Sequence, residues 1–156
     1  RQNIIGVSGQ VWTETIKGGE MLEYYLFPKM LGYVERAWNG DPNWSTQATE
    51  DEMKAGRAKE WNQFVNLVSQ RELPRLEHIF GGVQFRLPKP GVSVINEQVQ
   101  VNAAFPGMLI RYTDSGQEPT ENSPIYREPI YMRPGYTPRF KLFMQSGKSG
   151  MSSGID

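Results

Sequence analysis

A tryptophan and a glutamate near the start of the chain, Trp12 and Glu14, are the residues best suited to act on a ligand. The residues before them, Ile4–Val11, are mostly apolar or small, which is typical of a buried strand. Side chains two apart on an extended backbone point the same way, so this pair would share one face. An aromatic plate beside a carboxylate suits a sugar ring. The alternative is a tryptophan in the core followed by a solvated glutamate.

The next segment has the periodicity of a helix. Its apolar positions fall four residues apart: Leu22, Leu26, Met30, Val34 and Trp38. Tyr25, Tyr33 and Ala37 widen this stripe. We therefore expect one helix over residues 23–38 that is buried on more than one side.

Together, the strand and the helix resemble the last strand and last helix of the catalytic barrel of glycoside hydrolase family 20, the β-N-acetylhexosaminidases. The resemblance rests on the strand that ends in Trp12-Thr13-Glu14, and on Phe27-Pro28-Lys29 followed by Glu35-Arg36-Ala37-Trp38. The family usually has arginine where this chain has Lys29. Residues 105–120 and 123–126 resemble the C-terminal β-sandwich of chitobiase-type hexosaminidases.

This resemblance implies an enzyme that removes terminal N-acetylhexosamine by substrate-assisted retaining catalysis, without a cofactor or metal. The general acid glutamate and its aspartate partner would lie upstream, so we expect no catalytic residue in this chain and no activity from it alone. Trp12 would wall the sugar pocket and Glu14 would bind the sugar's outer hydroxyls. The implied partners are N-acetylhexosamine glycans and the missing remainder of the barrel, and the implied location is periplasmic or secreted.

Composition excludes other classes of function. Lys plus Arg and Asp plus Glu each number 17, so the net charge of zero argues against a nucleic-acid partner. There is no cysteine, hence no disulfide, and no apolar run long enough for a membrane span. The sequence opens with Arg1-Gln2-Asn3 directly before a buried-type strand, which suggests a cut through a larger protein. The missing leader therefore says nothing about the targeting of that protein.

We expect two domains. Residues 1–81 would be the C-terminal portion of a (β/α)8 TIM barrel, and residues 82–156 a small immunoglobulin-like antiparallel β-sandwich. All four tryptophans precede this boundary and most prolines follow it. Alternating apolar residues predict the strands of the second domain: 83–87, 99–101, 108–112, 130–132 and 140–144. The Ser- and Gly-rich tail is either a disordered end or a last strand.

Several other residues are better explained by structure than by chemistry. Thr49 and Glu52 fit a capping box that opens a helix to about Gln70, so the adjacent Asp51-Glu52 is not the family's catalytic pair. His78 is the only histidine, and we expect it to be structural or solvent-facing.

Two other classes of function stay open. One is a carbohydrate-binding role for residues 82–156, for which Tyr126, Tyr131 and Tyr136 are the candidate platform. The other is a protein-interaction module that binds through its apolar helix faces, although exposed barrel surface would also cause self-association.

Overall fold

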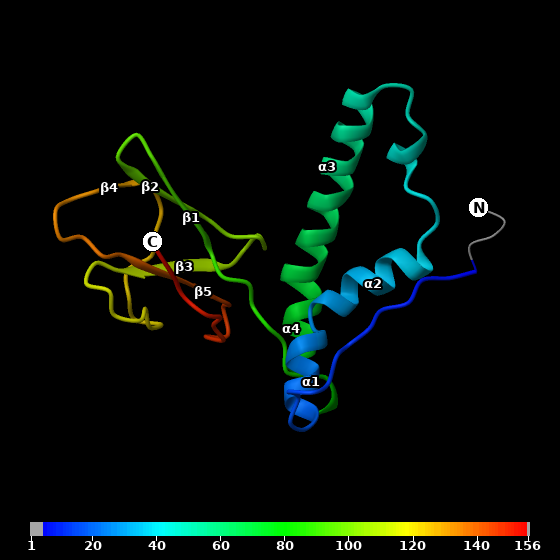
Figure 1. The fold of residues 1–156 in the computed structure, drawn as a ribbon, viewed down its shortest axis with the longest axis horizontal. Helices are drawn as coiled ribbons and strands as arrows, with labels where there is room; N and C mark the ends of the chain where they lie inside the picture. The colour runs from blue at the N-terminus through cyan, green and yellow to red at the C-terminus, as the bar shows by residue number, and fades with distance from the viewer. Residues whose placement is uncertain (1–4, 156) are drawn as a thin grey trace. The chain divides into compact units, whose positions relative to one another are not determined.

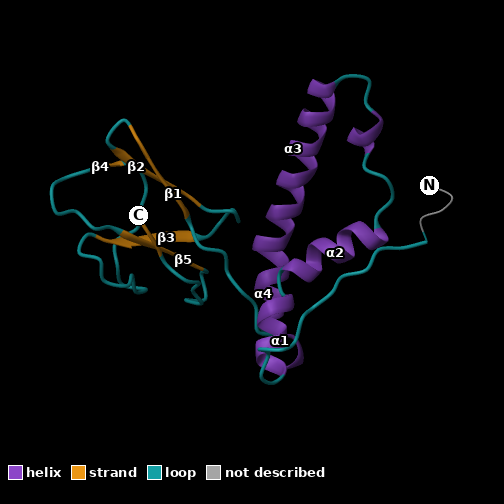
Figure 2. Cartoon of the chain, in the orientation of Figure 1, coloured by secondary structure: helices purple, strands orange, loops and turns teal. Residues whose placement is uncertain are grey.

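The computed structural model describes residues 5–155. The chain divides into two compact units, Arg1–Arg86 and Leu87–Asp156. Helices belong to the first unit and strands to the second (Figures 1 and 2). The chain is thus a mixed protein of a few helices and antiparallel sheets. Each unit is described by itself.

The helical pattern expected over residues 23–38 forms two helices, α1 (Gly19–Leu26) and α2 (Lys29–Trp38). The expectation of a single helix is wrong because a residue that precedes proline disfavours the helical conformation. Phe27 is accordingly extended, with φ −95° and ψ 141°. Pro28 has no N–H to donate to the preceding turn, and the peptide bond between the two residues is cis.

The apolar stripe of α2 is exposed. Met30, Val34 and Trp38 show 37%, 42% and 86% of their surface to solvent. The opposite side of the helix has neighbours, since a Cβ placed on Gly32 would lie 3.8 Å from the ring of Phe64. No residue of either helix is fully buried. The expectation of burial on more than one side is therefore wrong within residues 5–155, because no described element covers the stripe.

The capping box at residue 49 is confirmed and opens the longest helix, α3 (Glu50–Leu67). The Thr49 hydroxyl oxygen accepts a 3.2 Å hydrogen bond from the Glu52 amide. The Glu52 carboxylate accepts a 3.1 Å bond from the Thr49 amide. Two of the amides that a helix start leaves without partners are thereby satisfied. Asp51 and Glu52 are helix-start residues, as expected.

Short helical segments surround α3. A 3-10 turn, η1 (Asn43–Thr46), precedes it, and Trp44 of this turn donates a 2.8 Å hydrogen bond from Nε1 to Glu60. A π-helical stretch, η2 (Val68–Glu72), continues α3 into α4 (Leu73–Leu76), and η3 (Ile79–Gly81) follows. The buried residues of this unit lie mainly at its end: Val65, Val68, Ser69, Leu73, Leu76, Val83 and Phe85.

The strand expected over residues 4–11 does not form in the described part, residues 5–11. Residue 4 lies outside the described residues. A strand needs neighbouring strands to pair its backbone groups, and the described residues of this unit offer none. The segment is instead irregular and exposed.

The strand expected over residues 83–87 is also absent, although its alternation is real. Val83, Phe85 and Leu87 are buried, with 8%, 2% and 2% exposed. Their backbone makes individual bonds instead of a ladder. The Val83 amide donates to Leu76, the Gln84 amide to the Glu23 carboxylate, and the Arg86 amide to Phe27. Burial on one face therefore produced a strand-like pattern without a sheet.

The second unit contains two antiparallel sheets of three strands. One has the order β1 (Gly91–Ile95), β2 (Gln98–Asn102), β4 (Ile130–Tyr131). The other has the order β3 (Leu109–Thr113), β5 (Arg139–Phe143), β6 (Ser153–Gly154). Segments 99–101, 108–112, 130–132 and 140–144 thus contribute strands as predicted. The tail supplies β6, which decides between the two alternatives left open for it.

Tyr126 connects the two sheets. Its hydroxyl donates to the Val99 carbonyl at 3.2 Å and accepts from the Val101 amide at 3.1 Å, both on β2. Its ring meets Phe140 of β5 edge-on, with ring centroids 5.6 Å apart. Val99 and Phe140 are fully buried. The core of this unit therefore lies where the sheets meet around this tyrosine.

Candidate functional site

The first candidate site is built where the N-terminal segment lies along α2. The Tyr33 hydroxyl donates a 2.6 Å hydrogen bond to the carbonyl of Val7. Gly9 lies against the same ring, because a Cβ added there would be 3.6 Å from two of its carbons. The segment then turns, with the Ile16 amide donating to the Thr13 carbonyl at 3.1 Å. The segment is therefore held against α2 without belonging to a sheet.

These contacts border a cavity of about 500 Å³ that is open to solvent. Its wall is mostly apolar and aromatic: Gly9, Gln10, Val11, Trp12, Thr15, Ile16, Tyr25, Leu26, Lys29, Met30 and Tyr33. Trp12 is part of this wall and still exposes 75% of its surface. A wall of this kind, with a few hydrogen-bonding groups, is typical of sites for small molecules.

The two residues predicted to act on a ligand are placed differently. Trp12 lines the cavity, whereas Glu14 does not. Glu14 is exposed and lies in the turn between Thr13 and Ile16. Its assignment as a sugar ligand stays a prediction.

Three wall residues were not singled out as site residues from the sequence. Tyr25, Lys29 and Tyr33 are spaced four apart, and all three line the cavity. For Lys29 and Tyr33, which both lie on α2, this spacing is the signal that would have found them, because residues four apart share one side of a helix. Tyr25 belongs to α1, so the spacing across the break does not place it. They were interpreted only as a buried stripe or as part of the family signature.

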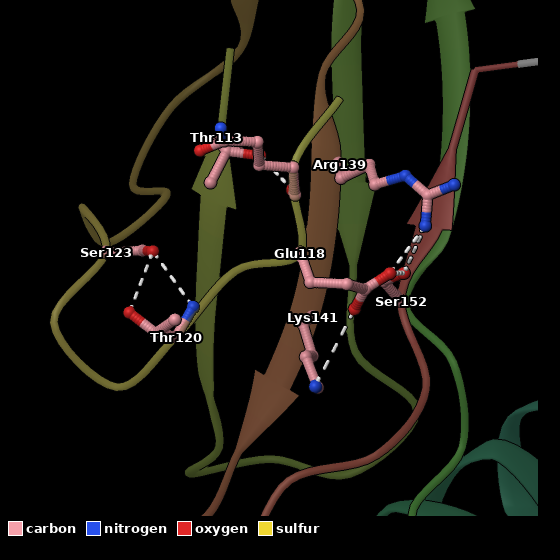
Figure 3. A network of polar contacts seen from close by, with 8 residues as sticks. Thr113, Glu118, Thr120, Ser123, Arg139, Lys141 and Ser152 are labelled. Carbon is pink, nitrogen blue, oxygen red and sulfur yellow. Dashed lines mark hydrogen bonds and ion pairs between the residues drawn. The ribbon is translucent and has the colours of Figure 1, made fainter. Parts of the chain in front are cut away.

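A second, polar cleft of about 740 Å³ lies in the second unit. Figure 3 shows its central network, in which three side chains contact the carboxylate of Glu118. The Ser152 hydroxyl donates to Glu118 Oε1 at 2.6 Å, and Arg139 donates to the same oxygen. Lys141 lies 3.7 Å from Glu118 Oε2. The network joins β5 to the C-terminal segment.

Neighbouring side chains and burial shift the pKa of Glu118 in opposite directions. The hydrogen bond from Ser152 is the largest influence on the pKa of Glu118 and lowers it, helped by the hydrogen bond and charge of Arg139 and the charge of Lys141. Burial raises the pKa and is the second-largest influence, but the lowering influences together outweigh it. Glu118 is therefore held in its charged form. Sequence reasoning missed this cleft because its members come from four separate segments.

The three tyrosines considered as a sugar platform are also distinguished. Tyr126 is committed to β2 through its hydroxyl, and its ring packs on Phe140. The hydroxyl of Tyr136 is buried. Tyr131 alone of the three is exposed, at 64%. Two of the three candidates are therefore structural.

The position of His78 agrees with the expectation that it faces solvent. His78 is exposed, next to the start of η3. The described part of the chain has no group of three or more His, Cys, Asp or Glu that could hold a metal ion. None of its helices has the length and the hydropathy needed to cross a bilayer.

Comparison with known families places both units. Residues 1–41, which contain the whole wall of the first cavity, match the model of the glycosyl hydrolase family 20 catalytic domain. Residues 72–135 match the chitobiase/β-hexosaminidase C-terminal domain. The first unit is therefore similar to the catalytic domain of glycoside hydrolase family 20, and the second to the C-terminal domain of chitobiases and β-hexosaminidases. The resemblance inferred from the sequence is thereby confirmed.

Family 20 relatives with names extend the comparison. The chain is 34% identical over 121 residues to N,N'-diacetylchitobiase of Vibrio harveyi, an alignment that covers 72% of this chain and 13% of that protein. It is 29% identical over 132 residues to β-hexosaminidase of Vibrio vulnificus, covering 74% of this chain and 15% of the relative. The chain thus spans about a seventh of the curated relatives that it matches.

Proposed function

We propose that the chain forms one wall of the sugar pocket of a β-N-acetylhexosaminidase, together with an accessory β-domain. The observation that carries the proposal is the exposed Trp12 ring at the 500 Å³ cavity. That cavity lies entirely within the residues that match the family 20 catalytic domain. An exposed tryptophan beside hydrogen-bonding groups suits the apolar face and hydroxyls of an N-acetylhexosamine.

The wall residues have distinct roles in this proposal. Trp12 stacks on the C–H face of the terminal sugar, and Lys29 offers ammonium donors to its oxygens. Glu14 accepts hydrogen bonds from the outer hydroxyls, each contributing about 1.5–3 kcal/mol when charge-assisted and shielded from water. Because Glu14 lies in an exposed turn, this role requires the sugar to extend beyond the cavity towards residues 13–16.

The chemical step belongs to residues outside this chain. In substrate-assisted retaining hydrolysis the N-acetyl oxygen of the sugar attacks its own anomeric carbon, so the protein supplies no nucleophile. It supplies a general acid glutamate and an aspartate that orients the acetamido group, and both are expected in the remainder of a (β/α)8 barrel. Residues 1–81 would then be the end of that barrel, in a periplasmic or secreted enzyme.

The exposed stripe of α2 supports this arrangement. Met30, Val34 and Trp38 form an apolar surface that water contacts within residues 5–155. Burying such a surface contributes roughly 25 cal/mol per Å². The remaining strands and helices of a barrel would cover it and would also pair the backbone of residues 5–11. The second unit then serves as an immunoglobulin-like accessory sandwich.

Hydrolysis of a 4-nitrophenyl β-N-acetylglucosaminide tests whether this chain supplies only the pocket wall while the catalytic residues lie elsewhere. The purified 156-residue chain is compared with a polypeptide that joins it to an upstream catalytic barrel sequence of the family. Release of nitrophenol by the longer polypeptide only is the expected result. Turnover by the short chain would place a catalytic acid within it. Absence of nitrophenol release by both polypeptides would contradict the hexosaminidase assignment.

A further inference from the structure

The side chains that line the polar cleft of the second unit have a net positive charge. Its wall contains three cations, Lys89, Arg139 and Lys141, and one carboxylate, Glu118. These side chains leave an excess of two positive charges. This imbalance lies in a unit that has no part in the sugar pocket proposed above.

The single carboxylate is already fully engaged. Glu118 Oε1 accepts from both Ser152 and Arg139, and Oε2 faces Lys141 (Figure 3). It therefore offsets Arg139 and part of the charge of Lys141. Lys89 makes no hydrogen bond or ion pair within residues 5–155, although it lines the same cleft. One ammonium group is thus free to meet a ligand.

The neighbouring strand adds to the positive charge. Arg111 of β3 stands directly opposite Lys141 of β5 in the sheet register. Like charges at opposite positions of a sheet are destabilising. Both cations lie about 6 Å from the ring of Phe143. The buried Nε of Arg111 has no acceptor among the described residues. Because Arg111 lies opposite Lys141, an anion bound near Lys141 would also reduce the repulsion between these two cations.

We propose that the cleft lined by Lys89, β5 and residues 150–154 binds a small oxyanion, namely a carboxylate, sulfate or phosphate group, with Lys89 as the free cation that closes on it. The ligand would neutralise the excess charge beside Arg139 and Lys141. The hydroxyls of Ser152 and Ser153 border the same space and can donate to an oxyanion once they release their present acceptors.

An NMR titration of the 156-residue chain tests the proposal. Sodium sulfate, phosphate and acetate are added in separate arms, each against sodium chloride at the same ionic strength. The expected result is a saturable shift of the amides of Lys89, Arg139, Lys141 and residues 150–154 with at least one oxyanion, and the arm with the tightest binding identifies the group. Shifts that match those in chloride would overturn the proposal.

Two variants with opposite expected effects sharpen the test. Lys89→Gln should weaken oxyanion binding by about threefold, since an exposed charge contributes a fraction of a kcal/mol to 1 kcal/mol. Glu118→Gln removes the competing carboxylate and should strengthen binding. Lys59→Gln on exposed α3 makes the same change in net charge in the other unit and should have no effect. Equal responses of Lys89→Gln and Lys59→Gln would contradict a specific site.

Discussion

The Tyr33 hydroxyl donates a 2.6 Å hydrogen bond to the carbonyl oxygen of Val7. This bond joins an irregular segment to a helix across 26 positions of sequence. It holds the residues that line one side of the Trp12 cavity against those that line the other. The shape of the candidate sugar site therefore depends on the Tyr33 side chain, because residues 5–11 are not held in a sheet.

Tyr33→Phe should loosen this cavity. Loss of the hydroxyl removes a hydrogen bond that contributes about 0.5–1.5 kcal/mol at most, because the pair is exposed. Hydrogen exchange of the amides of residues 8–12 should become faster. Tyr25→Phe is the matched control, since Tyr25 lines the same cavity but its hydroxyl makes no hydrogen bond to any described residue. Equal exchange rates in the two variants would show that the Tyr33 bond does not hold the segment.

Two helical glycines should respond oppositely to alanine. A Cβ on Gly56 of α3 would lie 2.5 Å from Cβ of Trp44, so Gly56→Ala should lower the free energy of unfolding by about 1–3 kcal/mol. A Cβ on Gly32 of α2 meets only Phe64, at 3.8 Å. Gly32→Ala should raise the free energy of unfolding by about 0.5–1 kcal/mol.

Urea unfolding followed by tryptophan fluorescence measures both changes. All four tryptophans lie in the first unit, so the signal reports the unit that contains both glycines. A stable Gly56→Ala variant would mean that η1 does not pack on α3 through Trp44.

The acid titration of Glu118 provides a third test. Its pKa lies below the ordinary value of 4.5, chiefly because the Ser152 hydroxyl donates to it. A lowered pKa in the folded state means that the stabilisation is present above about pH 4.5 and is lost as the pH falls through the folded value. Ser152→Ala should raise the pKa of Glu118 and move this loss of stability to higher pH.

Ser153→Ala serves as the control for that titration. The Ser153 hydroxyl donates to Pro90 at 2.8 Å and not to Glu118. Side-chain carboxyl resonances followed by NMR give the pKa of Glu118 in each variant. An unchanged value in Ser152→Ala would show that Arg139 and Lys141 determine the pKa without the hydroxyl.

Local signals in the sequence predicted local structure well. The Thr49 and Glu52 pair specified a helix start because both of its bonds lie within one turn. Alternation near residues 99–101 and 140–144 predicted β2 and β5, whose inward residues Val99, Phe140 and Leu142 are fully buried. In each case the residues that carry the pattern also make the contacts.

Predictions that depended on distant partners were less successful. Residues 5–11 have the composition of a buried strand, but strand pairing requires neighbours that the described residues do not provide. The proline at 28 interrupted a continuous apolar stripe, and periodicity alone did not indicate the break. The Glu118 cleft assembles residues from positions 89, 118, 139–141 and 150–154, and no local pattern unites them.

In the proposed function, the Trp12 and Glu14 region is a wall of a hexosamine pocket. This role is tested most directly by kcat/KM for a 4-nitrophenyl β-N-acetylglucosaminide, measured in a complete enzyme that carries this sequence. We predict that Glu14→Gln lowers kcat/KM by about tenfold or more, consistent with the loss of a charge-assisted hydrogen bond. Glu20→Gln, which alters an exposed glutamate outside the cavity wall, should leave it unchanged. Equal values for Glu14→Gln and the unaltered enzyme would contradict the account.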